Sequence, residues 1–544
     1  MDRSTVTLIG AATEIGLRSQ SDRTFPDYSR YLLIAYALVN AVLYSVLLPL
    51  WEGFDEPFHF AYVQQLANWQ GLPDARTSRL SGEVAASIRL APASDSVKQN
   101  LAQVTTYEEY FSLPTRERLE LRRKLRAIPA ELRWQSSEFL NYEGHQAPLA
   151  YLLLAWPERL LARVSLPTRV ASLRIVAAVA GSLFLLLGAE RLFVQLGIGD
   201  PYRSMALFCL LSSQMMWATL AHVANDWLAV PIALWTLVAL IALASNPSGR
   251  TASLASLCLA AGLLTKAYFL ALIPLLIGMC ALRKRWRELA IVSLILCGLA
   301  SPWYLRNIVK YGVLTGTQEA RAGIGLTAVL RNAPAIHWPS VIWSSVRTAL
   351  WTGNNTFSTF SANTLSFMMG ALTVALLLWA TSRQARRKRI SDAESFTIWY
   401  CVLFALALGY AAVVSHIYSH GAAEGPSPWY AQVLLGPLLG LAFLGVSRRR
   451  RIGRFVAAVL VLVFGYVLAA TYAVKLIPLY GGFEGRTTLA GVAMLYSHRL
   501  GILAANLDAV TLAPAAAIFV LAGVVIALVA AQQILLVVRV MRTR

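Results

Sequence analysis

The chain has 544 residues, of which 57% are hydrophobic and only 14% are charged. This composition excludes an ordinary soluble globular protein and indicates a polytopic membrane protein. The net charge of +20 does not indicate nucleic-acid binding, because the basic residues occur in short runs between apolar segments, the pattern that orients membrane helices.

Apolar segments of about the length that a spanning helix needs, roughly 20 residues, recur along the chain. We therefore expect an all-α polytopic membrane protein with about twelve transmembrane helices and no soluble domain of ordinary size. The five cysteines lie inside these segments without disulfide or metal-ligand spacing, so they indicate small buried apolar residues. The expected spans are 31–51, 172–192, 202–222, 227–245, 252–265, 267–282, 288–304, 362–382, 396–416, 428–447, 453–475 and 514–538.

Runs of lysine and arginine predict the orientation of these spans, because such runs remain on the cytoplasmic side. They occur at 283–287, 383–389, 448–454 and the C-terminal end. The polar segment 1–30 is expected to be cytoplasmic as well and not a cleaved signal peptide. In an inner or plasma membrane, the segments that then face the periplasmic or extracellular side are 52–171, 305–361, 417–427 and 476–513.

The first outer segment, 52–171, contains one apolar stretch and one basic stretch that are unusual for an outer loop. The apolar stretch 147–164 would reverse every later loop if it crossed the membrane, and Pro157, Glu158 and Arg159 interrupt it. We interpret it as a re-entrant or surface-lying helix. The basic stretch 115–126, TRERLELRRKLR, predicts a helix with a solvated charged face, and binding of anionic lipid headgroups or of a phosphate-bearing substrate is the alternative.

The first span ends in the sequence WEGFDEPFHFAYVQQLANWQGLP at 51–73. Asp55 is expected to start a helix, which places Glu56 and His59 on the same short face. The apolar residues that follow recur at helical spacing, which favours a helix along the membrane surface with its aromatic side in the interface. The alternative is a helix N-cap with solvated charges.

Ionisable groups at membrane depth are costly, so they mark candidate functional sites. On the expected topology, polar groups from distant parts of the chain converge on the outer face. They are Asp55, Glu56, His59, Glu143, His145, Gln146, Asn225, Asp226, Lys266, Arg306 and Asn307.

Five motifs occur here in a familiar order: EGFDEPFHFAYVQQLANWQGLP, EGHQAPLAYLL, ANDWLA, GLLTKAYFLALIPL and PWYLRNIVKYGVLTG. In this order they resemble the C-type (GT-C) membrane glycosyltransferases, which include protein O-mannosyltransferases and the lipid A aminoarabinose transferase. The resemblance covers about residues 30 to 320. Ala147 replaces the first proline of the usual HQPPL motif, and Trp429-Tyr430 stands where relatives often carry Arg-Tyr.

The resemblance implies a catalytic membrane module at 31–320, including the outer segment 52–171, and a C-terminal transmembrane module at 321–544. It further implies a polyprenyl-phosphate-linked sugar donor, a lipid, glycan or protein acceptor, and an outer-facing pocket in which Asp55 is the general base. Asp55 and Glu56 are then the catalytic candidates. The substrate-binding candidates are His59, Glu143, His145, Gln146, Asn225, Asp226, Lys266, Arg306 and Asn307.

A carboxylate can take the proton of an attacking hydroxyl, and a single displacement would invert the anomeric carbon. The departing lipid phosphate needs a cation, for which Lys266 and Arg306 are available. Alternatively, Glu56, His59 and His145 could hold a divalent metal ion, since carboxylate and imidazole ligands suit zinc or manganese.

Two other functions fit the same composition. A lipid or sugar transporter or flippase would carry its charges near the membrane midplane, in discontinuous helices of corresponding halves. In a non-enzymatic envelope assembly protein, the acidic cluster would only cap a helix.

Overall fold

The computed structural model describes residues 28–101, 103–386, 390–421, 425–483 and 489–542. Within them the chain is almost entirely helical. Most of the predicted cytoplasmic segment 1–30, and parts of the basic run 383–389 and of the predicted loops 417–427 and 476–513, lie outside the described residues.

In the part of the chain that the structure describes, eight helices are long and apolar enough to cross a membrane, or nine if the bent pair α15 and α16 is one span. The chain is thus a polytopic membrane protein. The eight spans are α2 (Tyr28–Leu47), α9 (Leu166–Gln195), α12 (Asp226–Ser245), α20 (Ala362–Arg386), α21 (Asp392–Tyr418), α22 (Gln432–Ser447) with the preceding turn η6 (Pro428–Ala431), α23 (Arg450–Ala470) with its continuation η7 (Thr471–Leu476) and α24 (Ile477–Tyr480), and α27 (Ala515–Arg542).

The remaining apolar segments do not form straight helices of span length, so the expected number of twelve is not confirmed. The predicted span 202–222 is broken at Ser212 and Ser213, where Tyr36 Oη and Trp217 Nε1 both donate to the Leu211 carbonyl oxygen. The pair α15 and α16 is bent by 47°. These shorter helices are α10 (Tyr202–Leu211), α11 (Gln214–Leu220), α13 (Gly249–Leu263), η3 (Ala267–Leu272), α14 (Ile273–Leu282), α15 (Trp286–Leu299) and α16 (Ser301–Tyr311).

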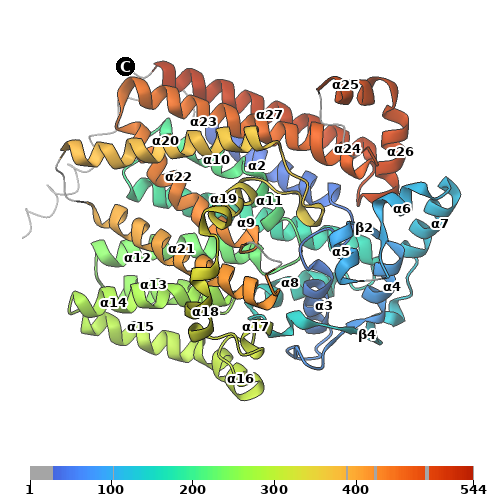
Figure 1. Cartoon of the computed structure of the whole chain (residues 1–544), viewed down its shortest axis with the longest axis horizontal. Helices are drawn as coiled ribbons and strands as arrows, with labels where there is room; N and C mark the ends of the chain where they lie inside the picture. Colours follow the sequence, from blue (N-terminus) through green and yellow to red (C-terminus); the bar gives the residue numbers. More distant parts are fainter. Residues whose placement is uncertain (1–27, 102, 387–389, 422–424, 484–488, 543–544) are drawn as a thin grey trace, which may run out of the picture.

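Residues 52–165 form a compact mixed unit at one end of the helices, drawn in blue to cyan in Figure 1. It holds two small sheets, β1 with β4 antiparallel and β2 with β3 parallel. Its elements are α3 (Glu56–Ala67), β1 (Arg79–Ser81), α4 (Gly82–Leu90), β2 (Pro92–Ala93), α5 (Asp95–Asn100), β3 (Thr105–Thr106), α6 (Tyr107–Ser112), α7 (Thr115–Arg126), η1 (Ala130–Trp134), β4 (Ser136–Leu140), η2 (Tyr142–His145) and α8 (Leu149–Leu160).

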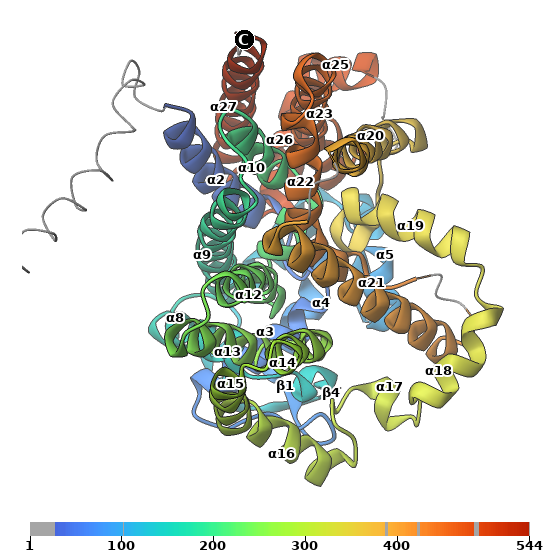
Figure 2. The same cartoon turned by 90° about the vertical axis from the view of Figure 1, so that its left-hand side faces the viewer.

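Two further groups of short elements complete the fold. Figure 2 shows the first group running down one side of the bundle, from α19 through α18 to α17, and it comprises α17 (Gln318–Arg321), α18 (Leu326–Asn332), η4 (Ala333–Ala335), α19 (Trp338–Leu350) and η5 (Asn354–Thr356). The second group lies beside α6 and α7 in Figure 1, and it comprises α25 (Leu489–His498) and α26 (Leu500–Val510).

Helix α3 begins directly after Asp55, as the sequence predicts, but it does not lie on the membrane surface. Every residue of α3 except Gln65 is buried. Helix α8 packs along it, with Tyr62 stacked on Tyr151 at a ring distance of 4.1 Å. The aromatic side of α3 therefore faces protein, and the predicted interfacial position is wrong.

Helix α8 occupies the stretch that was interpreted as re-entrant or surface-lying. Its 12 residues give a length of about 18 Å, well short of the hydrocarbon core of roughly 30 Å. One side packs on α3, whereas Leu152, Leu153 and Trp156 are exposed. The stretch 147–164 is accordingly not a span of the bundle.

The long segment 52–165 and the basic turns lie at opposite ends of the bundle. Figure 1 shows the C-terminal end of α27, the facing ends of α20 and α21 and the turn between α14 and α15 on the left, and the 52–165 unit on the right. This separation agrees with the orientation that the lysine and arginine runs predict.

The side of the membrane that each end faces can be tested by thiol labelling. In a background that lacks the five native cysteines, Arg116→Cys in α7 should react with a membrane-impermeant maleimide in intact cells. Arg287→Cys in α15 should react only after permeabilisation, because its end carries the basic turns. Labelling of Arg287→Cys alone in intact cells would contradict the orientation.

Candidate active site

Asp55 is the centre of the polar cluster at the end of the first span. Its backbone is left-handed, with φ of 54°, a conformation that is costly for a residue with a side chain and that concentrates at functional sites. The carboxylate does not cap α3; instead Oδ1 accepts a 2.5 Å hydrogen bond from Tyr142 Oη. The predicted alternative, an N-cap with solvated charges, is therefore wrong.

The environment of Asp55 favours its protonated form more than water does. Burial raises the pKa of Asp55, while the Tyr142 hydroxyl and the Lys266 ammonium oppose that rise and Asp226 adds to it. The side chain is half-buried. Asp55 is thus a carboxylate with raised basicity that is not fully buried, and both properties suit a general base.

Glu56 has a different environment, although it is the next residue. It is fully buried and paired with Arg174 of α9, whose Nε donates to Oε1 at 2.7 Å and whose Nη2 pairs with Oε2. The Val223 backbone N–H donates to Oε1 as well, at 3.0 Å. Burial alone would raise the pKa of Glu56, but Arg174 brings it below its usual range. Both oxygens are occupied, which favours a positioning role over the predicted catalytic one.

The turn η2 supplies a second carboxyl group to the cluster. Burial and the nearby Asp55 carboxylate raise the pKa of Glu143, so its protonated form persists to higher pH than that of an ordinary glutamate. Its Oε2 lies 3.8 Å from His59 Nδ1. A side chain at Gly144 would place its Cβ 2.8 Å from the Ala75 backbone nitrogen, so the turn fits only with glycine.

The two histidines near this turn are buried and held by neighbouring groups. His59 Nδ1 is hydrogen-bonded to Tyr151 Oη at 2.8 Å, and His145 Nδ1 donates to the Tyr142 carbonyl oxygen at 2.7 Å. Burial lowers the pKa of His145 to about 4. Burial also lowers the pKa of His59 below its usual range. Both imidazoles are therefore neutral at neutral pH.

Further polar groups of the Asp55 cluster come from the start of α12 and from the turn after α13. Asp226 and Lys266 form a buried ion pair, and the Lys266 ammonium lies 4.6 Å from the Tyr430 ring centre. Asn225 Nδ2 donates to Gln146 Oε1 and to the Thr265 carbonyl oxygen, each at 3.1 Å. Segments 142–146, 225–226 and 266 therefore meet around Asp55, as the sequence predicts.

Arg306 and Asn307 on α16 stand apart from this cluster. Arg306 Nη2 donates to the Pro73 carbonyl oxygen at 2.7 Å. Asn307 Nδ2 donates to the carbonyl oxygens of Leu314 and Thr315 and so holds the turn after α16. No hydrogen bond or ion pair in the described part of the chain joins either residue to Asp55, so their predicted substrate role is not supported by contact.

The predicted metal ligands Glu56, His59 and His145 do not form a metal site. Both oxygens of Glu56 are bound to Arg174, and the Nδ1 atoms of the two histidines face a tyrosine hydroxyl and a carbonyl oxygen. Among the described residues, no three His, Cys, Asp or Glu side chains group closely enough to hold a metal ion. The donor geometry therefore does not fit this metal prediction.

The sequence did not single out several residues of this region. Arg174 lies near the start of the predicted span 172–192, where a charged residue is itself a signal. Glu52 is fully buried, accepts a 2.8 Å hydrogen bond from Tyr107 Oη, and burial raises its pKa to about 7. Trp429 stacks on Phe54 at a ring distance of 4.2 Å, so Trp429-Tyr430 belongs to the site despite its departure from the family pattern.

Neither a protein-family model nor a curated protein matches the sequence. Among solved structures, the chain is similar to the crystal structure of ArnT from Cupriavidus metallidurans bound to undecaprenyl phosphate, at 13% identity and a TM-score of 0.46, over 94% of this chain and 78% of that chain.

ArnT is a GT-C lipid A aminoarabinose transferase, a type that the sequence motifs resemble. At this identity and TM-score, the similarity does not say what this chain binds or which reaction it performs. The case for its chemistry rests on its own residues.

The Glu56–Arg174 pair yields a stability prediction. Arg174→Met leaves a buried, unpaired carboxylate, which typically costs about 3 to 5 kcal/mol, so the thermal unfolding midpoint in detergent should fall sharply. Adding Glu56→Leu should restore part of the loss, since the orphaned charge is removed. The control is Arg89→Met, because Arg89 pairs with Glu138 on the surface and such pairs contribute about 1 kcal/mol or less. Equal midpoints for the two single variants would refute the role of this pair.

Proposed function

We propose that the chain is a membrane glycosyltransferase that moves a sugar from a polyprenyl-phosphate-linked donor to a lipid, glycan or protein acceptor at the outer face of the membrane. The observation that carries the proposal is the placement of Asp55: a half-buried carboxylate on a strained backbone, held by Tyr142 and surrounded by polar groups from three distant segments. Placing so many polar groups together at the end of a span costs free energy, so such a cluster marks a candidate functional site.

Asp55 takes the proton of the attacking acceptor hydroxyl in this proposal. Among the described residues, Tyr142 is its one side-chain hydrogen-bond partner and occupies Oδ1, so Oδ2 can face the acceptor. As the new bond to the anomeric carbon forms, the bond from that carbon to the phosphate oxygen breaks and the lipid phosphate leaves. A single displacement of this kind inverts the anomeric centre.

The leaving phosphate requires a positive charge close to the reacting carbon. Lys266 is the buried cation of the cluster, and its ammonium has three donors, of which the Asp226 ion pair engages at least one. Tyr430 lies against the same ammonium and limits its freedom. Lys266 is therefore the residue that we assign to the phosphate, with Asp226 as its positioning partner.

The other two functions have less support. A transporter site would lie near the middle of the spans, whereas Asp226 begins α12, Lys266 follows α13 and Asp55 follows α2. In an assembly protein the acidic group would cap a helix, and the Asp55 side chain makes no cap hydrogen bond.

The proposal predicts a specific kinetic effect of Asp55→Asn. Asparagine keeps the size of the side chain but cannot take a proton, so the rate of transfer from a panel of polyprenyl-phosphate sugars should fall by about 10²- to 10⁴-fold. Retention of the same donors, measured by native mass spectrometry, should change little because the loss lies in the chemical step. A rate within severalfold of the wild type would remove Asp55 from the general-base role, and a parallel loss of donor retention would place it among the binding residues.

Tyr142→Phe should shift the pH dependence of the reaction. The Tyr142 hydroxyl lowers the pKa of Asp55, so removing it raises that pKa and leaves less of the basic carboxylate at a given pH. The acid limb of the rate profile should therefore move to higher pH. Tyr304→Phe is the matched control, since its hydroxyl donates to the Leu263 carbonyl oxygen. Unchanged acid limbs in both variants would contradict the proposed contact.

A further inference from the structure

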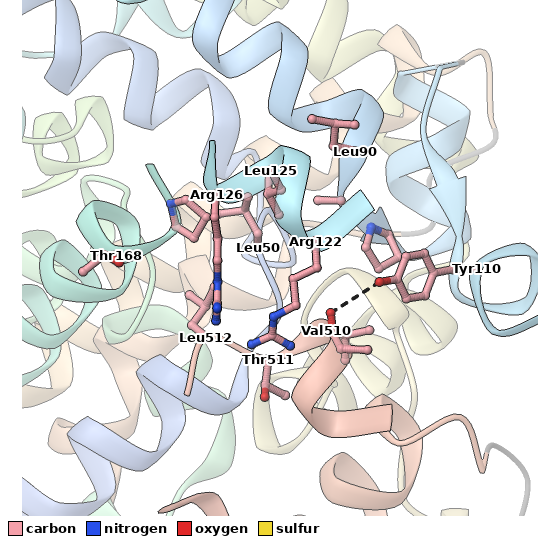
Figure 3. A pocket seen from close by; sticks show the side chains of 14 residues that line it. Leu50, Leu90, Tyr110, Arg122, Leu125, Arg126, Thr168, Val510, Thr511 and Leu512 are labelled. Carbon is pink, nitrogen blue, oxygen red and sulfur yellow. Dashed lines mark hydrogen bonds between the residues drawn. The ribbon is translucent and has the colours of Figure 1, made fainter. Parts of the chain in front are cut away.

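A groove at the edge of the bundle lies between α7 and α26 and is separate from the Asp55 cluster. One part of it is lined by Arg122 and Arg126 of α7 together with apolar residues such as Leu50 and Leu512. Figure 3 shows the two arginine side chains extending side by side toward Thr511 and Leu512. A second, more open part of about 620 Å³ shares the two arginines and continues along α26.

Three of the six basic residues of α7 have partners that explain them. Arg118 Nη1 donates to Asn506 Oδ1 at 2.8 Å. Arg123 and Lys124 both pair with Glu120, at 2.6 Å and 3.9 Å. These contacts stabilise the helix and its packing, so they require no ligand.

Arg122 and Arg126 have no such explanation. Within the described ranges of the chain, neither forms an ion pair, and Arg122 Nη1 is buried without a hydrogen-bond partner. The carboxylate among the residues that line the groove, that of Asp508, accepts the Ala515 backbone N–H through Oδ1. Burial and the neighbouring Arg126 lower the pKa of Arg122, and the attraction of the Asp508 carboxylate only partly opposes this. Two adjacent cations spaced four residues apart on one helix repel each other, and a bound anion would relieve this cost.

The position of the groove identifies the source of that anion. Leu50 follows the end of α2, Thr168 lies in the first turn of α9, and Pro514 precedes α27. Three spans therefore start or stop at the groove, which places it at the level where a bilayer has its headgroups. Leu119, which lines the groove, and Ile502, which lines an adjoining hollow between α7 and α26, are exposed, as expected for side chains that contact lipid.

We propose that the groove between α7 and α26 binds the phosphate of an anionic phospholipid. Arg122 and Arg126 donate to the phosphate, and the apolar residues of the groove contact the acyl chain of the lipid. Two guanidinium groups can hold phosphate oxygens with charge-assisted hydrogen bonds. This assignment concerns a second site, and it holds whether or not the Asp55 cluster transfers a sugar.

The experiment uses the full-length protein and compares retained lipids by native mass spectrometry. Purified protein is mixed with equal amounts of phosphatidylglycerol and phosphatidylcholine. The wild type should retain phosphatidylglycerol selectively, and Arg122→Gln/Arg126→Gln should retain it about 25-fold less, since each interfacial cation contributes about fivefold to lipid binding. The control Arg116→Gln/Lys124→Gln removes the same charge from exposed positions of α7 that do not line the groove, and it should behave as the wild type.

Thermal unfolding of each variant in detergent shows whether the fold is intact, which is expected because Arg122 and Arg126 make no ion pair within the described residues. Equal retention of phosphatidylglycerol by the groove variant and the wild type would overturn the proposal. So would an equal loss in the control variant, which would indicate a diffuse charge effect. Displacement of phosphatidylglycerol by millimolar inorganic phosphate would also overturn it, because the site would then bind free phosphate and not a lipid.

Discussion

The buried pair of Glu56 and Arg174 is the interaction on which the candidate site depends. The Arg174 guanidinium lies within a spanning helix and donates to the Leu48 and Pro49 carbonyl oxygens at the end of the first span, at 2.6 Å and 2.9 Å. Through Glu56 it also holds the first residue of α3 and the Val223 backbone. Because an unpaired buried charge is so costly, these segments must stay together.

This constraint explains the unusual backbone of the adjacent residue. Once the end of α2 and the start of α3 are both fixed to Arg174, the chain between them has to turn within a few residues, and Asp55 adopts its left-handed conformation there. Gly53 permits the turn, since a Cβ at this position would lie 2.6 Å from His222 Cβ. The strain at Asp55 is therefore maintained by the surrounding ion pair, which is how reactive side chains are held in place.

Much of the organisation could be predicted from the sequence because its signals are local. The length of apolar runs located six of the eight long spans within a few residues, and the first acidic motif gave the start of α3. The convergence of segments 142–146, 225–226 and 266 on Asp55 was predicted from the expected topology and from the resemblance to GT-C enzymes. In each case, hydrophobicity or a short motif carries the information.

The features that could not be predicted from the sequence depend on contacts between distant residues. The break between α10 and α11 arises because side chains compete for the Leu211 carbonyl oxygen, and one of them, Tyr36, comes from another helix. Helix α3 is buried because α8 packs against it, and this packing cannot be predicted from a local sequence pattern. Likewise, the pairing of Glu56 with Arg174, which favours a positioning role for Glu56 over a catalytic one, joins two residues that are far apart in the sequence.

We propose that Asp55 lies at the reacting carbon of a lipid-linked sugar. A cryo-electron microscopy map of the Asp55→Asn variant with a bound polyprenyl-phosphate sugar would show the position of that carbon. We expect the anomeric carbon near residue 55 and the phosphate against Lys266, with the lipid chain leaving the site. Donor density elsewhere on the protein, with the cluster around residue 55 closed, would contradict it.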